Sequence, residues 1–565
     1  MAAAANRRVW GAGKGFTRGA CVHFNLATVF DTIADAVADR DAIVFRDRRL
    51  TYRQLQERAN RLAYLLARRG YGCHTGRGSL KDFESGQDHL GLYLYNGNEY
   101  LEGMLGAFKA RLAPFNVNYR YVDEELLYLL NNASTKALIF HSSLAQHVES
   151  IQGEVPSLEL LLQVRDDDRP LVDGALDFEQ ALAASDASPL DIELPPDDLY
   201  IIYTGGTTGM PKGVLWKQSD ILIASLGGRR GSGKVMQSLA DYRDRALNGD
   251  RRHMPAPPFM HGAGHWTAFQ AFNTGGTVVI QDEVKRFDAA GAVEIIEREQ
   301  VNNLLIVGDA FGRPLADALR ASGATCPSLK NLLTGGAIMT AKLKAELLEL
   351  LPHINIIDTA GSSETGGQAS HVSNAASGAA SGRFKLSAHN AVLSDDLSRI
   401  LDPGHEGLGW WARTGNIPLG YLGDENKTRE TFPTVDGVRY SVPGDKVRLL
   451  PDETLELHGR ESVTINSGGE KIFAEEVEQA IKHHPAVYDA VVAGRPSERW
   501  GSEVVAIVQF RSGADASREE LLEECERHIA RYKLPKAFLF LDEIFRSPNG
   551  KADYKWAKSV ADQAN

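Results

Sequence analysis

The sequence predicts an α/β protein: a large N-terminal domain of parallel-rich sheets covered by helices, with a β-rich subdomain, and then a small α+β C-terminal domain. Three observations lead to this prediction. Short apolar runs alternate with helical stretches up to about residue 400. The segment 402–445 is rich in Gly, Pro, Thr and Trp. A compact unit of about a hundred residues, the size of a small domain, follows Arg460.

The N-terminal elements follow from hydrophobic periodicity. A helix is expected over 28–38, where Val29, Ile33 and Val37 recur at helical spacing, and a second helix is expected to begin at Thr51 and to run through Leu65. Short apolar runs predict strands at 42–45, 90–94, 137–140, 199–202, 277–280, 303–307 and 332–333. The stretch 73–88 is Gly-rich, polar and aperiodic, which predicts an exposed loop.

The C-terminal elements are expected on the same grounds. The composition of 402–445 indicates β-structure with turns. A helix is expected from 474, because acidic residues crowd its first turn, where the helix dipole favours them. Strands are expected at 490–492 and 504–508. We place the domain boundary near Arg460 to Ser462, giving an N-terminal domain over 24–460 and a C-terminal domain over 461–565.

Composition excludes several function classes. The chain has 565 residues, of which 43% are hydrophobic and 24% charged, and a net charge of −12, which argues against a nucleic-acid partner. The four cysteines are scattered, so neither a disulfide framework nor a zinc site is expected and a reducing cytoplasm fits. No apolar run has the roughly 18 to 20 residues of a membrane span.

Residues 1–23 are expected to form a disordered leader or an over-long start. They contain Arg7, Arg8, Lys14 and Arg18, and no acidic residue occurs before Asp31, so a transit peptide is the alternative. The absence of an apolar core excludes a secretory signal.

The most informative segment is 203–214, which reads YTGGTTGMPKGV directly after an expected strand. Glycines let the backbone turn its N–H groups toward an anion, threonine hydroxyls add donors, and Lys212 adds positive charge. The spacing is neither that of a Walker A loop nor G-x-G-x-x-G. We therefore expect a polyphosphate-binding loop. Its expected ligand-binding residues are Thr204, Gly205, Gly206, Thr207, Thr208, Gly209 and Lys212.

This loop resembles the phosphate loop of the adenylate-forming superfamily, which contains acyl-CoA synthetases, luciferases and the adenylation domains of peptide synthetases. The resemblance continues in the same order along the chain, from about 203 to 551. It implies that Gly335, Gly336 and Ala337 approach adenine. It also implies that Glu364 holds Mg²⁺, for which oxygen ligands are suited, and that the neighbouring hydroxyl contacts the α-phosphate.

Further motifs complete the expected nucleotide site. The segment AGSSET contributes Ala360, Gly361, Ser362 and Ser363, although many relatives have an adenine-stacking Tyr where this chain has Ala360. The resemblance implies that Asp445, in Pro-Gly-Asp, accepts hydrogen bonds from the ribose hydroxyls and that Arg460 also reaches the ribose.

The resemblance implies that the C-terminal domain is mobile. The hinge falls on Ser462, where most relatives have Asp or Lys, and the loop with Ser467, Gly468, Gly469 and Lys471 would line the coenzyme A channel. Lys551, in Ser-Pro-Asn-Gly-Lys, matches the catalytic lysine of the family. Its ammonium would lie between the substrate carboxylate and the α-phosphate and stabilise the transition state electrostatically.

The resemblance also places His261, in PPFMHGAGHW, beside the acyl carboxylate. A single histidine in an apolar stretch is otherwise often a core residue, so both interpretations remain. Amino-acid-activating relatives usually carry an Asp in this segment, and 259–265 contains no acidic residue, so amino-acid substrates are disfavoured.

The implied function is an acyl-CoA synthetase that uses ATP, Mg²⁺ and coenzyme A. It would convert a carboxylic acid into acyl-AMP and then acyl-CoA. The strings 361–367 and 466–471 look most like actinobacterial fatty-acyl-CoA ligases, so a medium-to-long fatty acid or a steroid-derived acid is expected.

Alternatives remain open from the sequence. One is an acyl-AMP ligase that loads a carrier protein, another is a non-catalytic nucleotide-binding homologue, and a luciferase-like oxygenase is formally compatible. Lys551 and Glu364 are both present, which disfavours the non-catalytic homologue. The sequence also leaves open a homodimer and a peripheral contact with a membrane.

Overall fold

A computed structural model describes residues 23–204, 210–379, 382–460, 463–467, 470–497, 501–548 and 550–564 of the chain. The expected leader, apart from His23, lies outside the described residues. So do the loop glycines and threonines 205–209, the expected hinge Ser462, and Gly468 and Gly469. The described residues form an α/β fold with β-rich parts, as the sequence predicts.

The largest sheet has eight strands in the order β15-β14-β13-β12-β10-β11-β1-β2. Its six inner strands are parallel, and β2 and β15 pair antiparallel at its edges. The strands are β1 (Asp41–Phe45), β2 (Arg48–Thr51), β10 (Arg252–Pro255), β11 (Thr277–Ile280), β12 (Asn303–Ile306), β13 (Asn331–Gly335), β14 (Asn355–Ser362) and β15 (Gly366–Ser373).

A second sheet of five parallel strands has the order β4-β3-β5-β6-β7, and a small antiparallel sheet, β19-β9-β8, lies beside it. The strands are β3 (His89–Tyr93), β4 (Ala113–Asn116), β5 (Thr135–His141), β6 (Leu160–Val164), β7 (Leu176–Asp177), β8 (Leu199–Thr204), β9 (Lys212–Lys217) and β19 (Gly420–Tyr421).

Successive side chains of a strand point to opposite faces of its sheet, so each sheet contributes to an apolar cluster on either face. In β1, Ile43 joins the apolar cluster between the two sheets, whereas Val44 faces the opposite cluster. In β5, Ile139 joins the shared cluster and Phe140 the outer one, as the two-residue period of a strand requires. The strands are buried on both faces because helices cover them.

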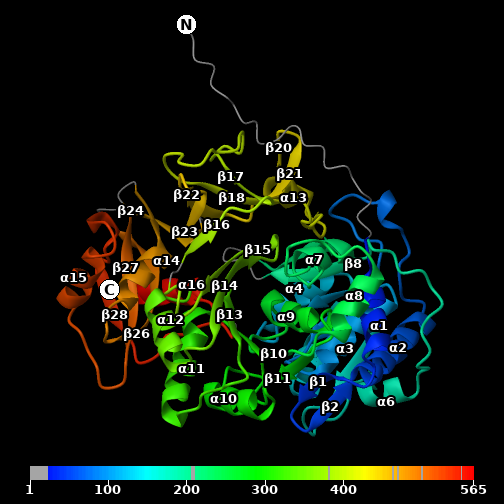
Figure 1. Ribbon diagram of the computed structural model, residues 1–565. Helices are drawn as coiled ribbons and strands as arrows, with labels where there is room; N and C mark the ends of the chain where they lie inside the picture. The colour runs from blue at the N-terminus through cyan, green and yellow to red at the C-terminus, as the bar shows by residue number, and fades with distance from the viewer. Residues whose placement is uncertain are drawn as a thin grey trace.

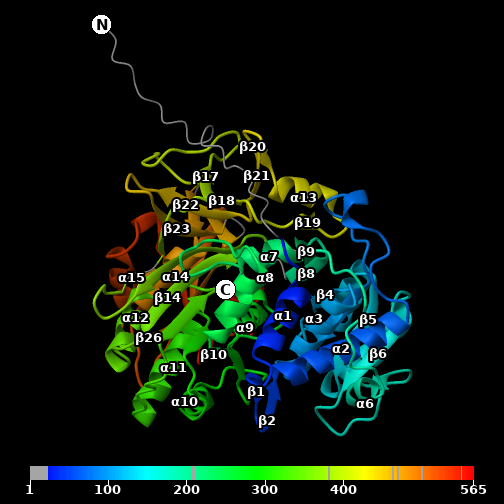
Figure 2. The same cartoon turned by 45° about the vertical axis from the view of Figure 1, so that its right-hand side comes forward.

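Helices supply the covering layers (Figures 1 and 2). The layer between the sheets contains α1 (Leu26–Ala36), α2 (Tyr52–Arg68), α3 (Asn98–Lys109) and α9 (Gly262–Phe272). The outer face of the large sheet is covered by α10 (Ala289–Arg298), α11 (Gly308–Ser322) and α12 (Ala341–Leu350). The remaining helices of this part are α4 (Asp123–Asn132), α5 (Ala145–Ile151), α6 (Phe178–Ala183), α7 (Gln218–Ala224) and α8 (Leu239–Leu247).

The region after residue 380 is β-rich, as expected, but it contains one helix that the composition did not indicate. Its sheet runs β16-β23-β22-β18-β21-β20, with β17 also pairing β18. The strands are β16 (Arg383–Lys385), β17 (Asn390–Leu393), β18 (Gly409–Thr414), β20 (Thr434–Val435), β21 (Val438–Ser441), β22 (Asp445–Leu449) and β23 (Thr454–Arg460). Asp424 is the N-cap of helix α13 (Glu425–Thr431), and its carboxylate accepts the N–H of Lys427.

The described residues 463–564 are called the C-terminal part below, coloured orange to red in Figure 1. Their two apolar clusters draw no member from earlier in the chain. The elements are β24 (Thr464–Ser467), β25 (Glu470–Phe473), α14 (Ala474–Lys482), β26 (Val487–Ser497), β27 (Gly501–Phe510), α15 (Arg518–Glu526), β28 (Ala537–Phe540) and α16 (Tyr554–Gln563). The exact domain boundary stays a prediction.

Most expected elements are present, with shifted ends. Helix α1 begins two residues before the expected 28 because Asn25 caps it, and α2 begins after Thr51, as expected, with Thr51 and Gln54 forming a capping box. The loop 73–88 contains a short 3₁₀ turn, and an antiparallel bridge between Cys73 and Gln87 joins its two ends. Gln87 and Asp88 at its end are buried. Among the described residues, no helix is both long and apolar enough to cross a membrane.

Candidate active site

A cavity of about 1510 Å³ opens where the parallel strands of the large sheet end. Its wall includes Val307 after β12, Gly335 at the end of β13 and Ser362 at the end of β14. Ligands of open α/β sheets bind at the carboxyl ends of the strands, so this is the expected location of a site. The volume exceeds the roughly 300–1,000 Å³ usual for one small ligand and leaves room for two.

The two ends of the expected phosphate loop reach this cavity. Thr204 ends β8 and Lys212 begins β9, and the two are partners across the antiparallel pair. Both line the cavity. The Lys212 ammonium lies 2.6 Å from Asp424 Oδ2, and this carboxylate also caps α13. The pKa of Asp424 is lowered despite partial burial, because Lys212 and the Lys427 N–H both favour the charged form.

Gly336 adopts a backbone conformation that side chains rarely take, with φ of 79°. A Cβ added there would lie 3.2 Å from Lys551 Cε and 4.0 Å from its Nζ. The lysine of the C-terminal part therefore extends over the β13 turn, and both residues line the cavity. The glycine leaves space for this approach.

Glu364 is held by the surrounding strands. Tyr421 donates its hydroxyl to Glu364 Oε1 at 3.0 Å, and the hydroxyl of Ser441 donates to the Glu364 carbonyl at 2.7 Å. Trp216 donates to the neighbouring Ser363 carbonyl at 2.8 Å. Ser362, Ser363 and Glu364 all line the cavity, and the Ser362 hydroxyl accepts the Glu364 N–H at 3.2 Å and contacts Thr365 Oγ1.

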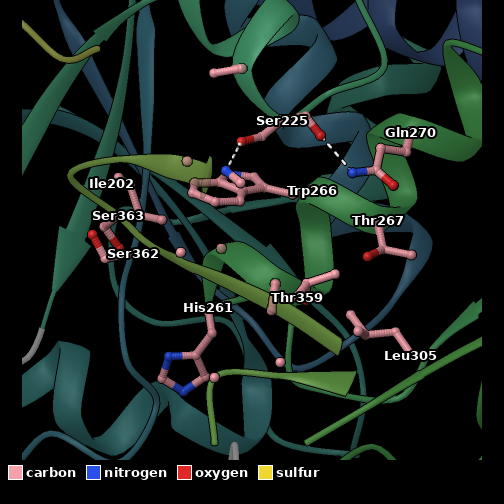
Figure 3. A pocket seen from close by; sticks show the side chains of 18 of the residues that line it. Ile202, Ser225, His261, Trp266, Thr267, Gln270, Leu305, Thr359, Ser362 and Ser363 are labelled. Carbon is pink, nitrogen blue, oxygen red and sulfur yellow. Dashed lines mark hydrogen bonds between the residues drawn. The ribbon is translucent and has the colours of Figure 1, made fainter. Parts of the chain in front are cut away.

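Two histidines of one segment have different environments. His265 is a core residue: its Nδ1 is 2.6 Å from the Phe259 carbonyl and its Nε2 contacts the Tyr200 hydroxyl. His261 lines the cavity, and its Nε2 has no hydrogen-bond partner among the described residues (Figure 3). Burial, followed by the charge of Lys551, lowers the pKa of His261 to about 3, so the imidazole is neutral near pH 7.

The loop that carries Lys551 is fixed by an ion pair from inside the C-terminal part. Arg546 binds Asp489 through two hydrogen bonds of 2.6 and 2.8 Å and donates to the Gly550 carbonyl at 3.1 Å. Lys482 lies 3.1 Å from the same carboxylate. These cations hold the pKa of Asp489 well below its usual range although the group is buried.

The structure brings most described candidates together. The cavity is lined by Thr204, Lys212, His261, Gly335, Gly336, Ala360, Gly361, Ser362, Ser363, Glu364 and Lys551. Ala337 does not line it and packs against an apolar cluster instead. Asp445 pairs with Arg460 on the neighbouring strand, close to the cavity-lining Pro443, but Asp445 does not contribute to the wall.

Of the expected coenzyme A loop, the described residues show the side chain of Ser467 alone. Ser467 is buried in β24, opposite Glu470 of β25, and does not line the wall. The side chains of Arg460 and Lys471 are not among the described ones.

Sequence reasoning missed several cavity residues. Tyr421 lines the wall and holds Glu364, and Asp424 beside it pairs with the cavity-lining Lys212. Both come from a segment about sixty residues or more away in the chain, and no local signal links them. Trp266, Thr267 and Gln270 also line the wall. Their helical spacing from His261 would have predicted one cavity-facing side of α9 if the segment had been interpreted as a helix.

Comparison with known proteins agrees with this geometry. The family model described as AMP-binding enzyme matches residues 30–422, and the model described as AMP-binding enzyme C-terminal domain matches residues 476–551. The medium-chain acyl-CoA ligase Mig of Mycobacterium avium is 51% identical over 541 residues, which cover 95% of this chain and 98% of that protein.

A second relative is the medium/long-chain-fatty-acid–CoA/3-oxocholest-4-en-26-oate–CoA ligase of Mycobacterium marinum. It is 40% identical over 546 residues, covering 95% of this chain and 96% of that protein. The crystal structure of the anthranilate CoA ligase AuaEII in complex with anthranoyl-AMP matches with a TM-score of 0.77 at 20% identity, covering 96% and 98% of the two chains, and supports the fold. The chain belongs to the AMP-binding enzyme family, and the expected adenylate-forming relationship is confirmed.

Proposed function

We propose that this protein is an AMP-forming acyl-CoA synthetase. It would convert a carboxylic acid and ATP into acyl-AMP and pyrophosphate, and then transfer the acyl group to the thiol of coenzyme A. The observation that carries the proposal is the convergence of Lys551, His261 and Glu364 on one cavity, in a chain 51% identical to a named acyl-CoA ligase.

Lys551 would catalyse the first step electrostatically. A carboxylate attacking the α-phosphate brings two anions together, and a lysine ammonium between them reduces their repulsion and stabilises the transition state. Its position over the Gly336 turn supports this role, because the resemblance places the nucleotide there.

His261 would orient the acid. Its imidazole is neutral, and a neutral histidine can donate one N–H. With the proton on Nε2, the ring offers the substrate carboxylate a donor that no described residue uses. A charged histidine is not required.

Mg²⁺ would be held by Glu364 together with ATP phosphate oxygens. The donor set fits, because the Glu364 carboxylate lines the cavity and offers an oxygen ligand of the kind that this ion prefers. When bound, the ion would neutralise phosphate charge.

The second step would need a rearrangement of the C-terminal part. Lys551 lies at the cavity, whereas Ser467 of the expected coenzyme A loop lies in a hairpin away from it. A rotation near Ser462 would exchange the two and admit the thiol, so that one site serves both half-reactions. We keep the domain boundary at 460–461 on this basis.

The acid is proposed to be a medium-to-long fatty acid or a steroid-derived acid. The cavity volume of about 1510 Å³ leaves space beyond a nucleotide, and the named relatives act on acids of these classes. The competing function is an acyl-AMP ligase that loads a carrier protein, which differs in its acceptor rather than in its adenylation site.

The test is incubation of the purified protein with ATP, Mg²⁺ and a panel of fatty, aromatic and steroid acids, with and without coenzyme A, followed by mass spectrometry. Acyl-CoA that forms only with coenzyme A supports the proposal and identifies the acid class. Acyl-AMP that accumulates in the presence of coenzyme A favours the carrier-protein acceptor. If neither product forms with any acid, the proposed function is wrong.

A further inference from the structure

Helix α9 presents one face to the cavity. Gly262, Ala263, Trp266, Thr267 and Gln270 line the wall and recur at helical spacing. Between them, the helix packs its other face into the core through Gly264, His265, Ala268 and Phe269. One helix therefore forms a wall that runs from His261 at its N-cap into the depth of the cavity.

The chemistry of this wall changes along the helix. Gly262 and Ala263 are small residues next to His261, and Trp266 with Leu305 of β12 gives an apolar middle. Thr267 and Gln270 follow, roughly 9 Å and roughly 14 Å beyond His261 along the helix axis. Figure 3 shows these two residues on the side of the cavity away from Ser362 and Ser363.

The polar groups at the far end face the cavity rather than the helix backbone. A helical threonine often donates to the carbonyl four residues earlier, as Thr32 does to Thr28 at 2.8 Å. The Thr267 hydroxyl makes no hydrogen bond with any described residue, although it lines the wall. Gln270 donates its amide N–H to the Ser225 carbonyl at 2.6 Å, which fixes the side chain and leaves its amide oxygen as an acceptor.

His253 adds a third uncharged polar group. It lies near the start of β10, and α9 runs back along this strand, so the second half of the helix lies beside it. The ring is within 3.2 Å of Asn303 Nδ2 and lines the same cavity. Burial, followed by the charges of Arg251 and Arg245, lowers the pKa of His253 to about 4, so it is neutral near pH 7.

We propose that Thr267, Gln270 and His253 form a subsite for an uncharged hydrogen-bonding substituent, an oxo or hydroxyl group, at the far end of an otherwise apolar acid. The inference rests on the proposed acyl-CoA synthetase activity and specifies its substrate. A wall that is apolar in the middle and polar at its end matches an acid with the same order of groups. An unsubstituted alkyl chain would instead remove these polar groups from water without replacing their hydrogen bonds.

The first test compares dodecanoic acid with its isomers that carry one hydroxyl at successive positions. We expect kcat/KM for acyl-CoA formation to peak for hydroxyl positions roughly 9–14 Å from the carboxyl group. The peak should exceed the value for dodecanoic acid by about tenfold, the effect of one neutral hydrogen bond. A flat profile, or preference for dodecanoic acid, overturns the subsite but not the synthetase; no turnover of any acid refutes both.

The second test replaces Thr267→Val, which keeps the shape and removes the hydroxyl. We expect kcat/KM for the best hydroxy acid to fall about tenfold, while that for dodecanoic acid rises because no hydroxyl is then buried unpaired against its alkyl chain. Thr267→Ser should restore the preference, and Thr32→Val in α1 is the matched control that leaves both values unchanged. Equal losses for the two acids in Thr267→Val, with an unchanged melting temperature, contradict the assignment.

Discussion

The proposed catalytic role of Lys551 depends on where its ammonium lies, because a lysine elsewhere on the surface carries the same charge. It extends over Gly336 at the cavity and lowers the pKa of His261, whereas Lys555, four residues later on α16, is exposed and away from the wall. The lysine would act only where two anions meet, which is the adenylation step. The two half-reactions should therefore depend on it unequally.

Replacement of Lys551→Ala should lower the rate of acyl-AMP formation by about a hundred- to a thousandfold, the usual effect of removing one group that stabilises a developing anion. Thioester formation from supplied acyl-AMP should be largely retained. Both rates can be measured separately by following pyrophosphate release and acyl-CoA formation. Lys555→Ala is the matched control and should change neither; equal loss of both half-reactions in Lys551→Ala would contradict the assignment.

At the scale of elements, the Lys551 loop depends on β26. Asp489 of β26 is buried, and its pairing with Arg546 and Lys482 connects the strand, the loop and α14. Arg546 also reaches the Gly550 carbonyl, next to Lys551. The network therefore sets the course of the loop, and removal of the carboxylate charge would leave two cations near a buried, neutral partner.

We expect Asp489→Asn to destabilise the C-terminal part by about 3–5 kcal/mol and to slow acyl-AMP formation more than thioester formation. The folded-state pKa of Asp489 lies below the ordinary value of 3.8, so its stabilisation is present above that pH and is lost as the pH falls through the folded pKa. The difference between wild type and variant in urea unfolding should therefore shrink below about pH 4. Asp562→Asn, which removes an exposed partner of Lys558, should change stability by less than about 0.5 kcal/mol. A difference that grows on acidification would refute this prediction.

At the scale of the whole molecule, the structure holds the C-terminal part against α11. A Cβ added at Gly550 would lie 3.2 Å from the Ala310 Cβ, and Arg120 lies 4.8 Å from the ring of Phe545. This docked arrangement places Lys551 at the cavity, whereas Ser467 of the expected coenzyme A loop does not line it. The proposed second step requires these contacts to break.

A disulfide between Ala310→Cys and Gly550→Cys should lock the docked arrangement, because the Cβ separation of 3.2 Å is close to the roughly 3.5–4.5 Å of natural disulfides. Gly550 has a φ of 73°, so the cysteine there is strained, and the single variant Gly550→Cys measures the effect of that strain on acyl-AMP formation. The oxidised protein should still form acyl-AMP but should not make acyl-CoA, and a reductant should restore the second step. Cys21→Ser and Cys73→Ser in the background avoid competing thiols, and the single variants serve as controls. Rapid acyl-CoA formation by the oxidised protein would show that no rotation is needed.

The sequence by itself determined the fold class and the family, because those depend on local signals. These signals lie in short segments: apolar runs such as 277–280, the capping box at Thr51 and the Gly-rich motifs in their order. The helix α13 was not predicted, since turn-rich composition around it outweighed seven residues of weak helical pattern. Within the candidate site, the lysine, glutamate and histidine were named from motifs, and the structure places all three at one cavity.

Only the tertiary structure determined which side chains contact each other and which line the cavity. Tyr421 holds Glu364, Asp424 pairs with Lys212, and Arg546 fixes the Lys551 loop through Asp489; each contact joins segments that are far apart in the chain. His261 and His265 look alike in sequence, but one is satisfied in the core and the other presents an unpartnered nitrogen to the cavity among the described residues. Burial and charge belong to the assembled environment of a group, and no local pattern determines them.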